Sequence, residues 1–280
     1  MRINTGPSGN VEDRRGMGGL AAGGGIGALV LGLLYMLLGG DPSGGGGNGG
    51  GVNVPGTTPP SRQAPADDAE GRFASQVLAS TEQTWTAIFQ GMGQQYQPPR
   101  LVLFEGGTGT ACGYGQSAMG PFYCPRDARV YIDLGFYREL SQRFHAPGDF
   151  AKSYVLAHEV GHHVQNLLGI SEQVERAQQA ASSKEEANAY SVRLELQADC
   201  LAGVWANKAR ERGEIEIDQN DVQTALNAAT AIGDDKLQQE GQGYVVPESF
   251  THGSSAQRVE WFSRGLQSGD LRQCDTFQGR

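Results

Sequence analysis

The residues with the clearest capacity for chemistry read HEVGH, from His158 to His162. Histidines at positions i and i+4 of a helix lie on one face, a turn apart, so both imidazoles can reach one metal ion at about 2.0–2.1 Å. The pattern H-E-x-x-H is typical of zinc-peptidase helices, in which the glutamate takes a proton from water that the ion has acidified. The sequence therefore predicts one catalytic zinc ion bound by His158 and His162, with Glu159 as the general base.

A second segment, RLELQAD from Arg193 to Asp199, offers the third ligand that a catalytic zinc ion needs. Glu195 and Asp199 are one helical turn apart, so we expect Glu195 to bind the metal and Asp199 to accept the free N–H of a ligand histidine. By itself the segment could be a solvated acidic helix face. The alternative third ligand, a histidine six residues after the motif, is excluded because Leu168 stands there, and Gln165 replaces the glycine of that pattern.

Three further polar residues receive predicted roles. His163 lies off the ligand face and is expected to pack or support rather than bind metal. His252 lies in a turn-like segment before a final helix that Ser254 can cap, and it is a candidate donor to the oxyanion of the transition state. Arg258 follows in the first turn of that helix, where a cation needs a nearby carboxylate or substrate carbonyl. The alternative for His252 and Arg258 is a surface histidine and a structural ion pair.

The four cysteines predict two disulfides, because an even number suits an oxidising compartment. A cysteine-rich zinc site would need close C-x-x-C pairs, which the sequence lacks. The short loop between Cys112 and Cys124 favours that pairing, which leaves Cys200 with Cys274.

The N-terminal part predicts a membrane anchor. Residues 17–40 carry no charge and are long enough to cross a bilayer as a helix. Arg14 and Arg15 precede this run, and the next basic residue is Arg62, so residues 1–16 are expected in the cytoplasm. A cleaved signal peptide is the alternative. The predicted protein is single-pass, with its catalytic domain periplasmic or extracellular.

The remaining chain divides into a flexible Gly- and Pro-rich linker, residues 41–70, and a catalytic domain, residues 71–280. Apolar periodicity predicts a helix-dominated α+β domain with a small β segment. We expect Asp149 to cap the helix of the metal motif and Gly169 to end it. The predicted helices are 71–91, 149–168, 184–212, 219–238 and 255–267, and the predicted strands are 101–104 and 130–134.

The charges make nucleic acid an unlikely partner class. The net charge is −9, and the Lys and Arg residues are scattered rather than gathered in a stripe. Partners are then a peptide or protein substrate and, through the N-terminal helix, a membrane. The oligomeric state stays open.

Five segments together resemble the putative neutral zinc metallopeptidase family of membrane-anchored bacterial proteins. They read AHEVGHHVQ (157–165), ELQADCLAG (195–203), GPFYCP (120–125), VYID (130–133) and THGSSAQR (251–258). The resemblance implies a zincin-like domain of gluzincin type that hydrolyses peptide bonds, and duties in catalysis for the pair His252 and Arg258. Two other functions remain open: a zinc amidase acting on peptidoglycan, and a non-catalytic zinc-containing module that binds in the cell envelope.

Overall fold

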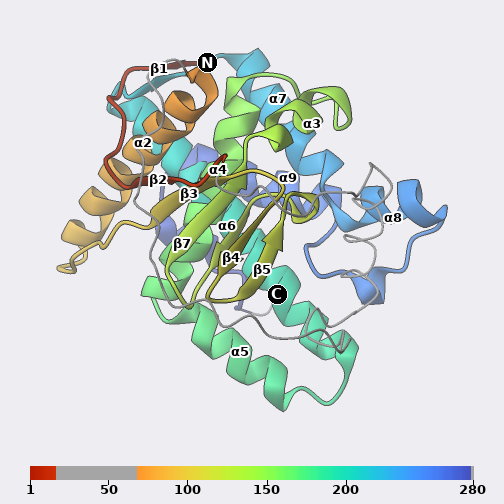
Figure 1. Ribbon diagram of the computed structural model, residues 1–280. Coiled ribbons are helices and arrows are strands. Elements are labelled where there is room, and N and C mark those ends of the chain that lie inside the picture. The colour runs from red at the N-terminus through yellow and green to blue at the C-terminus, as the bar shows by residue number, and fades with distance from the viewer. Residues whose placement is uncertain (17–67, 279–280) are drawn as a thin grey trace, which may run out of the picture.

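The computed structural model describes residues 1–16 and 68–278, which form mainly helices with a small sheet packed against them (Figure 1). The helices are α2 (Ala69–Gly91), α3 (Gly135–Gln142), α4 (Asp149–Leu167), α5 (Ile170–Ala180), α6 (Lys184–Glu211), α7 (Gln219–Ala231), α8 (Asp234–Gln242) and α9 (Ser255–Ser268). The strands are β1 (Arg2–Ile3), β2 (Val11–Asp13), β3 (Arg100–Phe104), β4 (Gly107–Thr110), β5 (Gly113–Gln116), β6 (Phe122–Cys124), β7 (Arg129–Asp133) and β8 (Ile215–Glu216).

The main sheet has the strand order β2-β3-β7-β6. The first three strands are parallel, and β6 runs antiparallel to β7. Strand β3 is almost wholly apolar because both of its faces are covered. Leu101 and Leu103 belong to the main core, whereas Val102 and Phe104 pack on the other face with Tyr131. The sheet thus fixes one side of the helical core.

Three helices cross at short distance in the centre of the molecule. Gly161 of α4 faces α6, where an added Cβ would lie 3.0 Å from the Ala198 carbonyl oxygen. Gly203 of α6 and Gly265 of α9 lie against each other's helices so closely that a Cβ on either would overlap backbone. Because glycine and alanine have small side chains, these helices can approach closely. Helix α4, which carries the metal motif, therefore lies directly beside α6.

Most helix boundaries follow the sequence, and three details differ. The N-cap of helix α4 is Gly148 and not Asp149, which instead lies in the first turn of the helix. The predicted helix 219–238 is two helices, α7 and α8, because Gly233 between them has an extended backbone (φ −72°, ψ 145°) rather than a helical one. Helices α3 and α5 were not expected from the sequence. Gly169 ends α4 with a left-handed conformation, as predicted.

Both predicted disulfides are confirmed. Cys112 is bonded to Cys124, and Cys200 is bonded to Cys274. The first joins the turn between β4 and β5 to β6, and the second joins α6 to the C-terminal residues. The second disulfide therefore ties the chain end to the helix that carries Glu195.

The fold prediction was wrong in placing a transmembrane helix ahead of the domain. Within residues 1–16 and 68–278, no helix is both long and apolar enough to cross a membrane. Residues 17–40, the basis of that prediction, and most of the predicted linker lie outside the described residues.

The first sixteen residues, predicted as a separate cytoplasmic segment, pack on the domain. Strand β1 pairs with β8, and β2 pairs with β3 at the edge of the main sheet. In Figure 1 this red segment runs beside α2 and along the sheet. Hydropathy reports only local apolar content, so it cannot detect pairing with strands that lie about a hundred residues or more away in the chain.

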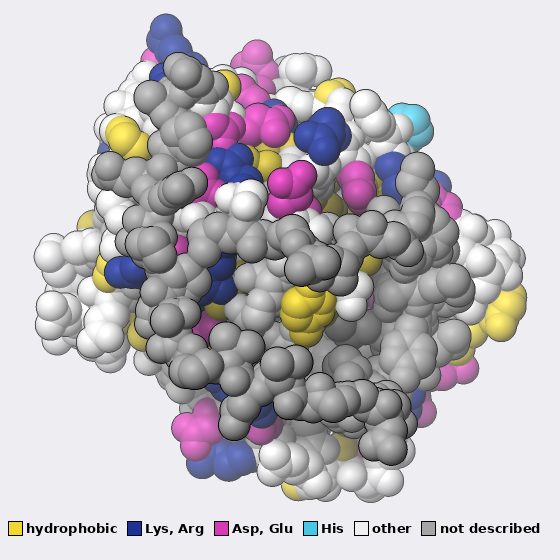
Figure 2. Space-filling model, viewed as in Figure 1, with side chains coloured by type: hydrophobic (Ala, Val, Ile, Leu, Met, Phe, Trp, Pro, Cys, Tyr) yellow, Lys and Arg dark blue, Asp and Glu magenta, His cyan; other side chains and the backbone are white. Residues whose placement is uncertain are grey.

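Charged side chains of both signs mix on the surface. On the face seen in Figure 2, Lys and Arg lie among Asp and Glu side chains. This mixture agrees with the scattered charges of the sequence.

Candidate metal centre

Helices α4 and α6 bring the three predicted ligands together. The ligand atoms of His158, His162 and Glu195 all lie within 4.8 Å of one another. The Nε2 atom of His158 is 3.2 Å from one carboxylate oxygen of Glu195, and the Nε2 atom of His162 is 3.4 Å from the other. Two turns of one helix thus face a single carboxylate on its neighbour.

This donor set fits a zinc ion. Ligand atoms that each lie about 2.0–2.1 Å from one tetrahedral ion are about 3.4 Å apart. The two histidine–glutamate separations, 3.2 and 3.4 Å, are close to this value. Two imidazoles and one carboxylate are also a known set for catalytic zinc, in which the fourth position is left for water or substrate. His158, His162 and Glu195 could therefore hold one zinc ion with little rearrangement.

Glu159 lies in the same cleft, as the motif requires of a general base. Its side chain is largely buried, and it lines the cavity together with all three candidate ligands. Burial raises the pKa of Glu159 above its usual value, although His158 and His162 oppose the shift. A raised pKa brings a carboxylate closer to the range in which it both takes and returns a proton.

Asp199 holds His158 in place, the role expected of it. Its Oδ1 atom is 2.8 Å from Nδ1 of His158 and accepts a 2.6 Å hydrogen bond from the Tyr154 hydroxyl. Because Asp199 accepts at Nδ1, the ring carries its proton there and leaves Nε2 for a metal. The Asp199 side chain is fully buried.

Arg258 is the charge partner of Asp199. It donates from Nε to Oδ2 at 2.9 Å and from Nη2 to Oδ1 at 3.0 Å, and a third bond reaches the Ile232 carbonyl. Burial would raise the pKa of Asp199, but Arg258 and His158 lower it to about 2. The carboxylate that draws Arg258 inward is thus Asp199, and Arg258 keeps that group ionised.

His252 projects into the cleft from a turn that Asp234 organises. The backbone N–H groups of Thr251, His252 and Gly253 all donate to Oδ2 of Asp234. The imidazole Nδ1 atom of His252 is 3.2 Å from Oδ1 of the same carboxylate. Burial lowers the pKa of His252, but Asp234 and Glu195 overcome it and raise the pKa.

The cleft around these residues has a volume of about 330 Å³ and combines apolar walls with the polar centre. One wall comes from residues 118–123 of the β segment, and another comes from α3 and the residues after it. The apolar and aromatic lining includes Met119, Phe122, Phe136, Phe144, Ile232 and Leu237.

The structure thus gathers the three candidate ligands, Glu159, Asp199, His252 and Arg258 in or around one cleft. His163 lies apart from the ligands, between the Tyr123 hydroxyl and the Gln97 carbonyl, in the packing role expected. Sequence reasoning missed Asp234 and Tyr154. Asp234 gives no sequence signal because its partners lie seventeen or more residues later, whereas Tyr154 lies one turn before His158 and could have been noticed.

Comparison with known proteins agrees with this geometry. Residues 2–277 match the family described as "Putative neutral zinc metallopeptidase". The "Uncharacterized protein YpfJ" of Escherichia coli strain K12 is 50% identical over 282 residues, covering 96% of each chain. The "Uncharacterized protein Rv2575" of Mycobacterium tuberculosis strain H37Rv is 42% identical over 255 residues, covering 86% of this chain and 84% of the relative.

No solved structure matches the chain. The family match spans the two N-terminal strands, the metal-motif helix and the C-terminal disulfide alike. This chain therefore belongs to the putative neutral zinc metallopeptidase family.

Proposed function

We propose that this protein is a zinc-dependent peptidase that hydrolyses peptide bonds at the cleft that His158, His162 and Glu195 line. One observation carries the proposal: two Nε2 atoms converge on one carboxylate, at 3.2 and 3.4 Å, with Glu159 beside them. A non-catalytic zinc site is usually closed by a fourth protein ligand, and it does not need a carboxylate such as that of Glu159 beside the ion.

Three side chains bind the ion in this proposal. His158, His162 and Glu195 each supply one donor atom, and Asp199 holds His158 so that Nε2 faces the site. Zinc bound there would supply Lewis acidity, which would polarise the scissile carbonyl and lower the pKa of water to about 7.

The proton transfers belong to Glu159. Its carboxylate takes a proton from the attacking water and then gives that proton to the leaving amine. His252 faces Asp234 with Nδ1, and Asp234 and Glu195 favour its doubly protonated form. In that form its other ring nitrogen donates a hydrogen bond to the oxygen that becomes negative during the attack. Arg258 acts indirectly, because it keeps Asp199 ionised and therefore keeps His158 oriented.

We also propose that the domain works in an oxidising compartment outside the cytoplasm. Two disulfides pair all four cysteines of the sequence, and such bonds persist where thiols are not kept reduced. The substrates would then be peptides or proteins present in that compartment.

The test uses the purified full chain, loaded with zinc, on a proteome-derived peptide library and on purified peptidoglycan. Mass spectrometry should find cleaved peptides, cleavage should stop after chelation, and added zinc should restore it. Release of peptidoglycan fragments with the peptide library intact would replace the proposal with an amidase. Tight zinc binding with neither substrate cleaved would indicate a non-catalytic binding module.

A further inference from the structure

The second ligand histidine, His162, has a neutral partner rather than a charged one. Its Nδ1 atom lies 2.9 Å from Oε1 of Gln165, three residues further along α4. The side chain of Gln165 is fully buried. Which nitrogen of His162 carries the proton depends on how this amide is oriented, since an amide oxygen accepts and an amide nitrogen donates.

The neighbours of Gln165 settle that orientation. Its Nε2 group donates to the Leu194 carbonyl at 2.7 Å and to Oε1 of Gln197 at 3.0 Å. A backbone carbonyl can only accept, so the NH₂ group of Gln165 must face it. Both protons of the amide are then used, and Oε1 is left to accept from Nδ1–H of His162.

Gln197 is oriented in the same way. Its Nε2 group donates to the Cys274 carbonyl at 2.9 Å, so its oxygen faces Gln165. Cys274 is itself bonded to Cys200 on α6. Two backbone carbonyls, at Leu194 and Cys274, thus determine a chain of amides that ends at a candidate metal ligand.

We propose that Gln165 is a positioning residue for the metal site. Its amide, held by the Leu194 carbonyl and by Gln197, keeps the proton of His162 on Nδ1 and presents the Nε2 lone pair to the ion. The two ligand histidines are then oriented by different means: His158 by the buried carboxylate of Asp199, and His162 by a neutral amide that adds no negative charge.

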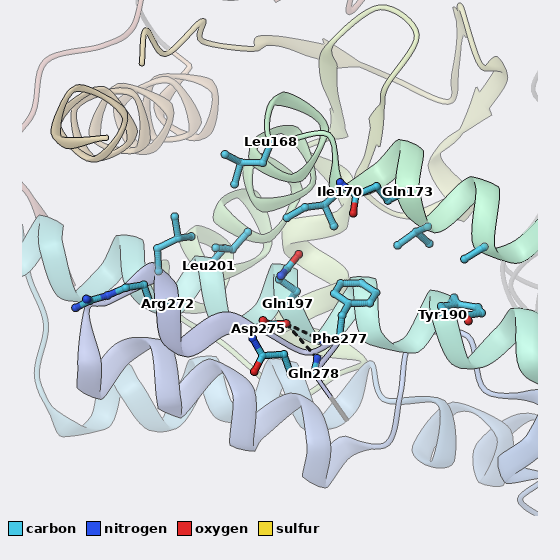
Figure 3. A pocket seen from close by; sticks show the side chains of 13 residues that line it. Leu168, Ile170, Gln173, Tyr190, Gln197, Leu201, Arg272, Asp275, Phe277 and Gln278 are labelled. Carbon is cyan, nitrogen blue, oxygen red and sulfur yellow. Dashed lines mark hydrogen bonds between the residues drawn. The ribbon is translucent and has the colours of Figure 1, made fainter. Parts of the chain in front are cut away.

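Gln197, the second amide of this hydrogen-bonded pair, borders a cavity, so it can be replaced in a test variant. Gln197 also lines a cavity of about 700 Å³ between α5, α6 and the C-terminal residues (Figure 3). A leucine at position 197 therefore has room, and this variant should fold. At position 165, leucine has a volume similar to that of glutamine but neither accepts nor donates hydrogen bonds.

Gln178 offers a matched control. It also joins two helices through its amide, donating to the Ala187 carbonyl and to the Ser191 hydroxyl, but it does not contact a ligand. Gln178→Leu therefore removes the same number of donated hydrogen bonds without touching the metal site.

The experiment measures zinc affinity of the full chain by competition with a chelator. Gln165→Leu should weaken binding by about 10- to 100-fold, the range typical for partners of ligand side chains. Gln197→Leu should weaken binding less, because the Leu194 bond remains. Gln178→Leu should bind zinc as the wild type does.

A second readout is the Nδ1–H signal of each ligand histidine in NMR spectra of the ¹⁵N-labelled, zinc-loaded chain. In Gln165→Leu the signal of His162 should exchange faster with solvent, while that of His158 stays protected by Asp199.

The inference rests on the proposed zinc site, but different results would contradict the role of Gln165 and the zinc site itself. A wild type that binds no zinc would contradict the proposed function itself. If the wild type binds zinc and Gln165→Leu binds it equally tightly, or loses no more affinity than Gln178→Leu, only the role of Gln165 is overturned. Unchanged protection of the His162 proton in Gln165→Leu would overturn it as well.

Discussion

The carboxyl groups of Glu159, Glu195 and Asp199 lie at or beside the candidate ligands, and their surroundings shift their pKa values in different directions. Burial would raise the pKa of Glu195, but His162 and His158 lower it well below its usual range. Asp199, paired with Arg258, is likewise ionised. Among these three groups, burial prevails at Glu159, where the pKa is raised. Environments that separate the pKa values of neighbouring acids are how one site assigns one carboxylate to binding and another to proton transfer.

Removal of one ligand tests the metal site residue by residue. Glu195→Ala takes away the only carboxylate among the three candidate donors, so zinc affinity should fall by more than the roughly 10- to 100-fold expected for a residue that only supports a ligand. Elemental analysis after dialysis measures the remaining zinc. Glu211→Ala, an exposed glutamate at the end of the same helix, is the control. Equal zinc content in the two variants would remove Glu195 from the ligand set.

His252 should act on the rate and not on the metal. His252→Ala removes one donor to the developing oxyanion, so kcat should fall by about 10²- to 10³-fold. Zinc content should change little, because His252 is not among the three converging donors. Steady-state kinetics on any cleaved peptide, with zinc measured in the same preparation, checks this. A wild-type kcat/KM would exclude His252 from the mechanism.

Sequence patterns could predict residues whose partners lie at helical spacing. His158, Glu159 and His162 share one helix, and Glu195 and Asp199 share another, so fixed spacings exposed them. The residues that support the ligands were not predicted, because their partners are far away in the sequence. Gln197 reaches Cys274, seventy-seven residues away, and no local pattern reports such a contact.

At the scale of helices and strands, α6, which carries Glu195, crosses α9 at short distance. Gly203 and Gly265 face each other's backbones there. Apolar periodicity predicted both helices to within about a residue at their ends. It predicted nothing of the crossing, because that depends on which glycines meet in space.

A single methyl group should therefore separate these helices. In Gly203→Ala the added Cβ would overlap the Phe262 carbonyl oxygen, and the backbone must move to remove this overlap. The free energy of unfolding should therefore fall by at least about 1–3 kcal/mol. Gly91→Ala is the control, because it ends α2 with nothing within 4 Å of the added atom. Urea unfolding of both variants measures the difference. Equal stability of the two would show that the crossing is looser than described.

At the scale of the whole molecule, the chain closes on itself, since residues 1–16 belong to the same folded body as residues 68–278. Backbone hydrogen bonds join Asn4 to Glu214, Ser8 to Ser75, Asn10 to Leu101 and Arg14 to Leu103. These contacts, together with strand pairing, cover the edge of β3. The anchor prediction placed residues 1–16 in the cytoplasm, apart from the domain, because it was based on the apolar run that follows them.

Deletion of residues 1–16 should consequently destabilise the folded domain, residues 68–278. Loss of the four backbone bonds above, at about 0.5–1.5 kcal/mol each, predicts a decrease of about 2–6 kcal/mol in the free energy of unfolding. The exposed edge of β3 should also promote association between molecules. Chemical unfolding and light scattering check the two effects. An unchanged unfolding curve would mean that the segment contributes nothing to the domain.

In the proposed function, the fold positions Glu159 to move protons beside a zinc ion held by His158, His162 and Glu195. The most direct test is the rate of peptide hydrolysis by zinc-loaded Glu159→Gln relative to wild type, with zinc content measured in both. Glutamine keeps the size of the side chain but cannot accept the proton, so hydrolysis should fall by at least about 10²–10⁴-fold. Zinc content should stay the same, because all three donors remain. Hydrolysis at the wild-type rate by the zinc-loaded variant would contradict the account.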